Sequence, residues 1–109
     1  MHDHYTVRIL AFQAGPWWVA QCLEFDVAVQ AKSLPDLFYE VERTVIGHLV
    51  VAEKRGLRAL EDLPPAPQRY WDLWDRSKMT VSRDPAPFRV PPAVGDRIPT
   101  PDIRIAQPA

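Results

Sequence analysis

Three short alternating segments followed by a capped helix constrain this fold more than any other feature of the chain. Residues 5–12, 17–23 and 27–31 are predicted strands, in which alternate residues fall on opposite faces, such as Trp18, Ala20 and Cys22 on one face and Trp17, Val19 and Gln21 on the other. A Gly-Pro turn separates the first two segments, and a short acidic turn separates the second from the third. Because both connections are short, we predict a three-stranded antiparallel meander.

A long helix is predicted directly after these strands. Ser33 is a good N-cap, Pro35 stands near the first helical position, and Gly56 is a good C-cap. Between the caps, apolar residues recur at helical spacing and predict a buried stripe of Leu37, Phe38, Val41, Val45, Leu49 and Ala52. We expect this helix to cover one face of the sheet.

The second half of the chain is rich in proline, and most of the 12 prolines lie at or beyond Pro64. Residues 68–78 are predicted as a short second helix, and the alternating residues 103–105 as an edge strand. The rest of this half is expected to be extended. The predicted fold class is therefore α+β, with a β-β-β-α domain over residues 1–63 and a proline-rich extension over residues 64–109, docked on the same domain.

Composition limits the functional classes. The net charge is −1, so the weak overall field argues against a general nucleic-acid binder. There is one cysteine, no signal peptide is visible, and no apolar run is long enough to span a bilayer, so we expect a cytoplasmic protein without an internal disulfide.

The first half resembles the HicB-like antitoxin family. The resemblance covers residues 5–56 and rests on the run WVAQCLEFD at residues 18–26, on Gln30-Ala31, and on the helix start SLPDL at residues 33–37. It implies a three-stranded sheet crossed by a helix, with one further strand after it, a reduced ribonuclease-H-like fold. Family members bind and neutralise a small ribonuclease toxin with a double-stranded-RNA-binding-like fold.

Two departures from the family pattern are visible. Ala31 stands where the family usually has glycine before the helix cap. The family's usual C-terminal helix-turn-helix or ribbon-helix-helix module is not visible in the proline-rich half, so DNA binding and autorepression are not expected.

Candidate reactive groups are few, and each has an ordinary structural interpretation. Cys22 alternates with apolar residues and is expected to be a buried thiol. His48 is expected at the boundary of the helix stripe, and the pair Glu24 and Asp26 is too small for a nuclease-type metal site. The terminal His2-Asp3-His4 has metal-ligand chemistry without a further ligand nearby. We therefore predict no catalytic residue, no metal and no cofactor.

Aromatic residues are the best candidates for partner binding, because such residues dominate interface hot spots. The candidates are Phe12, Trp17, Tyr70, Trp71 and Trp74. The last three are alternatively expected to anchor the second half of the chain on the sheet, and Phe12 and Trp17 to seal against the second helix or another subunit.

The sequence thus predicts a non-catalytic, antitoxin-type protein that binds and occludes a toxin-like ribonuclease. Two alternatives remain: a small nucleic-acid-binding or processing protein on the reduced ribonuclease-H-like fold, or a phage-type inhibitory interaction module. Open strand edges of a three-stranded sheet also predict a homodimer.

Overall fold

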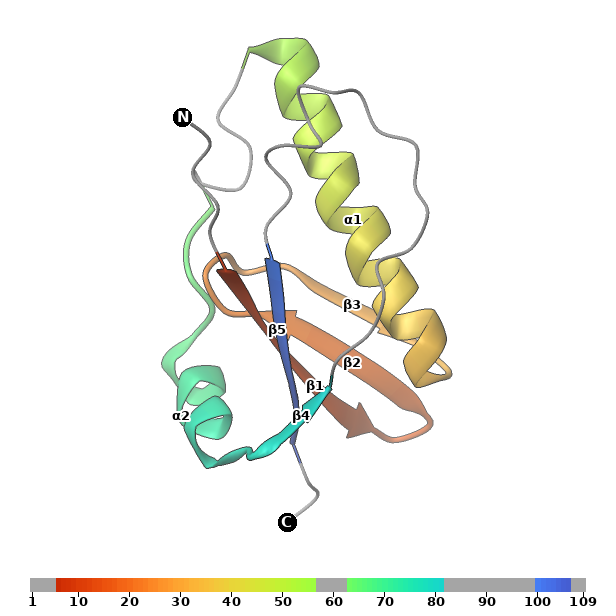
Figure 1. Ribbon diagram of the computed structural model, residues 1–109, viewed down its shortest axis with the longest axis vertical. Helices are drawn as coiled ribbons and strands as arrows, with labels where there is room; N and C mark the ends of the chain where they lie inside the picture. Colours follow the sequence, from red (N-terminus) through yellow and green to blue (C-terminus); the bar gives the residue numbers. More distant parts are fainter. Residues whose placement is uncertain (1–5, 57–62, 82–99, 107–109) are drawn as a thin grey trace.

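The computed structural model describes residues 6–56, 63–81 and 100–106, which form an α+β fold (Figure 1). The α+β class predicted from the sequence is confirmed. The elements in chain order are β1 (Thr6–Ala14), β2 (Trp17–Cys22), β3 (Ala28–Ala31), α1 (Leu34–Arg55), α2 (Gln68–Arg76), β4 (Met79–Val81) and β5 (Thr100–Ile105). The predictions for His2-Asp3-His4 and for residues 82–99 and 107–109 of the proline-rich extension fall outside the described residues.

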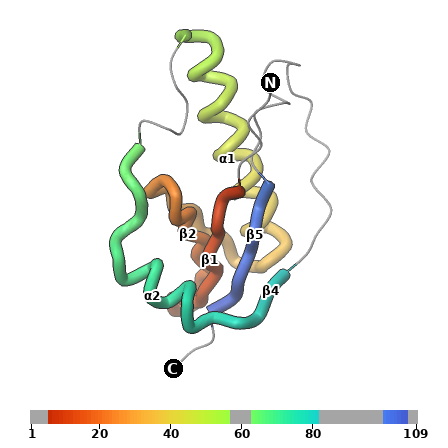
Figure 2. The backbone as a smooth tube through the Cα atoms, turned by 60° about the vertical axis from the view of Figure 1, so that its left-hand side comes forward, coloured from red at the N-terminus to blue at the C-terminus, as the bar shows by residue number. Residues whose placement is uncertain are grey.

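All five strands belong to one mixed sheet in the order β3-β2-β1-β5-β4. β1 pairs antiparallel with β2, and β2 antiparallel with β3. On its other side β1 pairs in parallel with β5, with Ile9 opposite Ile103, and β4 adds antiparallel to β5 (Figure 2). The two outer strands are therefore β3 and β4.

The predicted three-stranded meander is part of a sheet of five strands, and the placement of residues 103–105 at a sheet edge is wrong. β5 begins earlier, at Thr100, and lies between β1 and β4. Alternation identifies a strand, but not the strand beside which it lies. Here the partner is β1, at the other end of the sequence. The homodimer prediction assumed that β1 and β3 were both free edges of the sheet. β5 occupies the free side of β1, so of these two strands only β3 is an edge.

The long helix forms as predicted. The Ser33 hydroxyl accepts from the Asp36 N–H at 3.3 Å, a proline occupies the first turn, and Gly56 ends the helix at φ 65°, a conformation that glycine adopts without strain. The buried residues of α1 are the six predicted in the stripe. They pack on the face of the sheet formed by Val7, Ile9, Ala11, Ala20, Cys22 and Ile103, among others.

The short helix α2 packs on the opposite face, which we call the outer face of the sheet. Leu10 of β1, Leu23 after β2 and Ala106 after β5 form a second cluster there with Ala66 and Trp74. α2 ends at Arg76, two residues earlier than predicted, because Ser77 is extended and its hydroxyl donates to the Leu73 carbonyl at 2.7 Å. No helix within the described residues is both long and apolar enough to cross a membrane.

Candidate functional site

The structure brings most of the predicted aromatic residues together on the outer face. Alternation along β1 and β2 places Phe12 and Trp17 there, diagonally across the β1–β2 pair, since Ala14 is opposite Trp17 and Phe12 is opposite Val19. The Phe12 ring stacks on Tyr70 of α2, with 6.1 Å between centroids and 26° between the planes. Trp17, Phe12 and Tyr70 thus form an aromatic row, and all three side chains are partly buried.

Cations lie over the rings at both ends of the aromatic row. The Lys32 ammonium lies 5.6 Å from the ring centroid of Trp17, and the Arg69 guanidinium lies 4.8 Å from that of Tyr70. Arg69 also donates to the Tyr70 hydroxyl at 3.2 Å. Such pairs are attractive because the ring face carries the negative part of its quadrupole. Lys32 and Arg69 are both exposed, so a bound partner can reach them.

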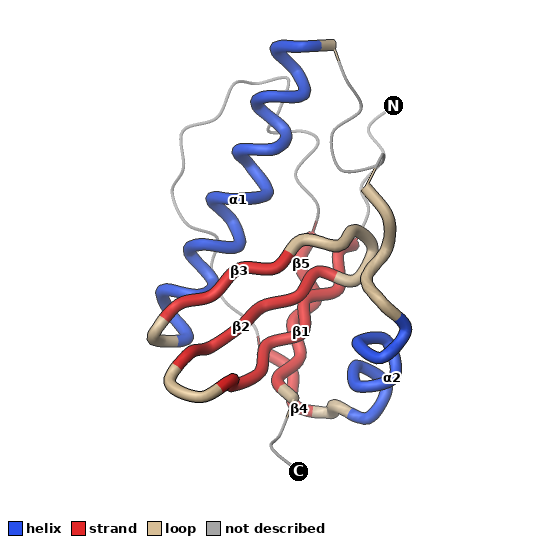
Figure 3. The backbone as a smooth tube through the Cα atoms, turned by 180° about the vertical axis from the view of Figure 1, so that it is seen from behind, coloured by secondary structure: helices blue, strands red, loops and turns tan. Residues whose placement is uncertain are grey.

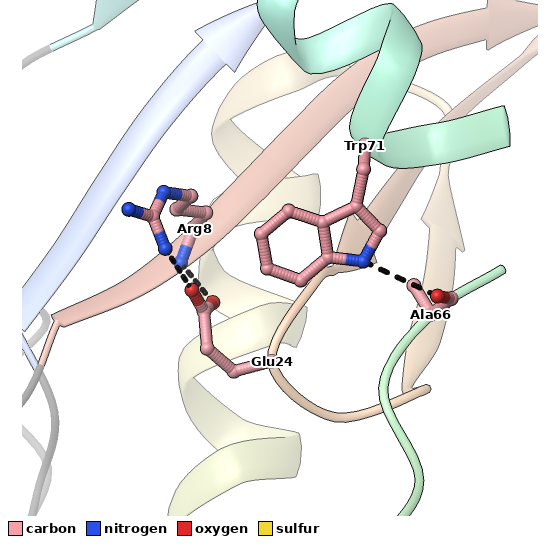
Figure 4. Close-up of polar contacts among 4 residues, drawn as sticks. All are labelled: Arg8, Glu24, Ala66 and Trp71. Atoms are coloured by element: carbon pink, nitrogen blue, oxygen red, sulfur yellow. Dashed lines mark hydrogen bonds and ion pairs between the residues drawn. The ribbon is translucent and has the colours of Figure 1, made fainter. Parts of the chain in front are cut away.

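Trp71 lies beside this row and is fixed on two sides (Figure 4). Its indole N–H donates to the Ala66 carbonyl at 3.2 Å, and the Arg8 guanidinium lies 5.6 Å from its ring centroid. Glu24 holds Arg8 in turn, accepting from the guanidinium at 2.5 Å and from the Arg8 backbone N–H at 2.6 Å. Because this ion pair is largely exposed, its main effect is to orient Arg8, and it contributes little stability.

Trp74 has a different position from the other four aromatic candidates. Its side chain is only 4% exposed and lies between α2 and the sheet. The Arg104 guanidinium of β5 lies 4.4 Å from its ring centroid and donates to the carbonyls of Trp74 (2.9 Å) and Ser77 (3.1 Å). The Trp74 carbonyl lies in the last turn of α2 and also accepts from the Ser77 N–H at 3.0 Å, and the Ser77 carbonyl follows directly after the helix. Arg104 therefore adds a donor where the end of a helix leaves acceptors short of partners. Trp74 therefore anchors the helix on the sheet.

The acidic turn is held by structural contacts. Glu24 pairs with Arg8, whereas Asp26 accepts from the buried Gln21 amide at 2.8 Å. The Gln21 amide also donates to the Cys22 carbonyl at 3.0 Å. The Asp26 N–H donates to the Pro64 carbonyl at 2.7 Å, which ties the start of the second half to this turn. Within the described residues, no three His, Cys, Asp or Glu side chains gather as metal ligands would.

Cys22 is buried on the α1 side of the sheet, as predicted. Burial, with the Glu24 charge as a smaller contribution, raises the pKa of its thiol to about 12. A thiol with such a pKa is almost entirely protonated near neutral pH and is a poor nucleophile. His48 is exposed on α1.

Half of the outer face carries no helix. α2 contacts the residues of β1 and the end of β5, whereas Trp17 and Val19 of β2 and the exposed Ala28 and Gln30 of β3 lie outside its cluster. Figure 3 shows this side, with α2 beside β1 and with β2 and β3 open to the viewer. The aromatic row therefore runs from Tyr70 on α2, across Phe12 on β1, to Trp17 on the half of the outer face that α2 does not cover.

Sequence reasoning missed the cations that organise this surface. Arg8, Lys32, Arg69 and Arg104 each lie over an aromatic ring. The sequence signal for two of them was the alternation around Arg8 and Arg104, which places each arginine on one face of a strand but does not show the ring beside it. Comparison of the chain with protein-family models, with curated proteins and with solved structures gave no match.

Proposed function

We propose that the protein acts by binding another protein through the uncovered half of the outer face, as a non-catalytic, antitoxin-type protein of the cytoplasm. The observation that supports this proposal most directly is the aromatic row of Trp17, Phe12 and Tyr70, which leaves the cover of α2 and continues onto β2. Tryptophan, tyrosine and arginine are the residues most enriched in interface hot spots.

The geometry fits binding by preorganised side chains. Phe12 is held by Tyr70, and Trp71 is held by Ala66 and Arg8. Rings that are already fixed lose little side-chain entropy when a partner covers them, and this reduces the cost of association. Trp74 contributes indirectly, because it holds α2 against the sheet and so positions Tyr70 and Trp71.

We propose a toxin-like ribonuclease as the partner and occlusion of its RNA-binding or catalytic surface as the mechanism. Support for this comes from the WVAQCLEFD run at residues 18–26 and from the strand order. The resemblance to HicB-like antitoxins implies one further strand after the long helix, and β5 follows α1 and extends the sheet beside β1. A reduced ribonuclease-H-like fold is part of the same proposal.

Co-expression of the full chain with each toxin-like protein encoded beside it tests this proposal. We expect a complex that survives affinity purification and gel filtration, and restored growth of cells that express the toxin. In the variant Trp17→Ala, loss of one ring of the row is expected to weaken the complex by at least about 2 kcal/mol, the size of a hot-spot effect.

Tyr39→Ala is the matched control, because Tyr39 is an exposed aromatic residue on α1, away from the outer face. It is expected to leave the complex intact. Failure of the wild-type chain to bind any neighbouring toxin-like protein would remove the antitoxin proposal. Equal weakening by Trp17→Ala and Tyr39→Ala would remove the outer face as the binding site.

A second candidate function is binding of single-stranded nucleic acid, favoured by the cations at both ends of the aromatic row. Proteins of that class stack bases on aromatic rings and neutralise phosphates with nearby cations. Fluorescence anisotropy with a labelled oligonucleotide of mixed sequence tests it. This function requires an affinity that falls steeply with salt and in Lys32→Ala, whereas the protein-binding proposal predicts no oligonucleotide binding near physiological salt.

A further inference from the structure

The outer strand β3 has a free edge whose backbone groups can be assigned by geometry. The Cys22 N–H donates to the Val27 carbonyl at 2.9 Å, one position beyond the last registered pair Gln21–Ala28, so Cys22 directs its N–H toward the β3 side of the antiparallel β2–β3 ladder. Hydrogen-bonded pairs alternate along a ladder, and Val29 and Ala31 therefore also bond to β2. It follows that the N–H and C=O groups of Ala28 and Gln30 point away from the sheet.

The edge is short, with four residues, but the side chains of β3 provide none of the other usual protections against strand pairing. Natural edge strands are commonly blocked by lysine, proline, a bulge or a covering loop. β3 has the sequence Ala-Val-Gln-Ala, with no charge and no proline, and Ala28 and Gln30 are exposed. Among the described strands, β3 pairs only with β2.

Charges of opposite sign stand at the two ends of β3. Asp26 precedes the strand, Lys32 follows it, and both are exposed. An antiparallel second copy centred on Val29 places Ala28 opposite Gln30 of that copy, so all the outward backbone groups of both strands are paired. The same register places Asp26 beside Lys32 of the second copy at each end. A shift by two residues in either direction separates the opposite charges and leaves one outward residue of each strand without a partner.

We infer that β3 is a homodimerisation edge, at which two copies of the chain join their sheets antiparallel about a two-fold axis at Val29. The Asp26–Lys32 pairs select the register, because a shift by two residues separates them and a parallel in-register arrangement would bring like charges together. This interface uses the strand edge, whereas the proposed partner binding uses the outer face. A monomeric protein would therefore not contradict partner binding at the outer face, and a protein that binds no partner there would not contradict dimerisation at β3. In the dimer, the uncovered halves of the two outer faces become continuous across the axis.

The first experiment uses the full chain and the variant Gln30→Pro, measured by light scattering after gel filtration over a dilution series. Proline removes the outward N–H of residue 30, and edge positions of this kind tolerate proline because no ladder bond to the neighbouring strand is lost. We expect a concentration-dependent dimer for the wild type and a dissociation constant raised about tenfold or more for Gln30→Pro. Gln30→Thr, which keeps the N–H, is the matched control and is expected to dimerise.

A second experiment does not depend on how well the proline variant folds. Lys32→Glu places a second carboxylate opposite Asp26 of the other copy, and Asp26→Lys places two ammonium groups together, so each variant alone is expected to be monomeric. Mixing the two restores opposite charges and is expected to yield a mixed dimer, visible by native mass spectrometry. Circular dichroism of each variant checks its fold.

Three results would overturn the inference. One is a wild-type chain that stays monomeric up to its solubility limit. Another is a dimer that is unaffected by Gln30→Pro in a protein with a native circular-dichroism spectrum. The third is a pair of charge variants that fail to form a mixed dimer although both are folded.

Discussion

The two faces of the sheet are covered in different ways. On one face, α1 places six regularly spaced apolar residues against the strands, and its own caps define both of its ends. On the outer face, α2 has no side-chain N-cap and is nine residues long. It is held by its own buried Trp74 and by Arg8 and Arg104, which come from the strands. The first face is encoded by local periodicity, and the second by contacts between distant segments.

Trp74→Ala is expected to have the largest effect on stability. Removal of a buried indole typically costs about 3–5 kcal/mol of unfolding free energy, and here it also detaches α2 from Leu10 and Ala106. Urea denaturation checks this value. Trp71→Ala, which removes a partly exposed indole, is the control and is expected to cost less. Equal losses in the two variants would show that the outer face has no dominant anchor.

Leu37→Ala tests the face under α1. Leu37 is fully buried, and a leucine-to-alanine change in a core costs about 2–5 kcal/mol. Unlike Trp74→Ala, it is expected to leave the outer face intact in the protein that remains folded, so that partner binding is unchanged. Val51 lies on the same helix and is 48% exposed, so Val51→Ala is expected to change the unfolding free energy by less than about 1 kcal/mol. A loss of partner binding in Leu37→Ala would mean that the two faces are not independent.

Arg104→Met sharpens the comparison, because it keeps much of the side chain's apolar length but removes its hydrogen bonds. The Ser77 carbonyl loses the Arg104 donor, and the Trp74 carbonyl keeps only the Ser77 N–H, which is expected to cost about 1–3 kcal/mol. Arg104→Lys retains a cation and is expected to recover part of this loss. Thermal unfolding of the three proteins is expected to rank the wild type first, the lysine variant second and the methionine variant last. A methionine variant as stable as the wild type would remove Arg104 from the anchor.

The smallest effect is a pH dependence that arises on the α1 face alone. Cys22 has its pKa raised to about 12 in the folded protein, against an ordinary value of 9.0. Above pH 9 the unfolded chain loses this proton and the folded protein retains it, so the contribution to stability is complete below pH 9 and declines between pH 9 and 12. The slope is about 1.4 kcal/mol per pH unit within that interval.

Cys22→Ala removes this titration and provides the control. Urea denaturation at about pH 8 and about pH 10 is expected to show a steeper loss of stability in the wild type than in the variant, by about 1 kcal/mol. The same loss in both proteins would show that other groups account for the alkaline decline.

The helices and strands whose ends and buried faces are determined by residues close together in the sequence could be predicted. Ser33, Gly56 and the apolar stripe of α1 lie within one continuous segment, and the structure confirms them. Three strand ends were off by one or two residues. β1 continues two residues further than predicted, to Ala14, and β2 ends and β3 begins one residue from the predicted positions, beside the acidic turn, where Glu24 and Asp26 are held by Arg8 and Gln21. The positions of β4 and β5 in the sheet could not be predicted from the sequence, because β5 pairs with a strand far away along the chain and β4 joins the sheet only through β5.

The candidate site was predictable in its residue types and unpredictable in its arrangement. Aromatic side chains on the strands and on a short helix could be named from the pattern, yet their contact at Phe12 and Tyr70 depends on how α2 docks. The burial of Trp74 depends on Arg104, which arrives with β5. A single sequence carries no periodic signal for a cation placed over a ring by another strand.

The parallel pair formed by β1 and β5 has a consequence for synthesis of the chain. Thr6 lies beside Thr100 and Ala11 beside Ile105, so β1 leaves the ribosome long before β5, its neighbour in the sheet, has been made. Until then its free side is exposed, and slow closure of such distant pairs lengthens the interval in which nascent chains can aggregate. Ribosome-bound chains that end before residue 100 should therefore need a chaperone that the finished protein does not.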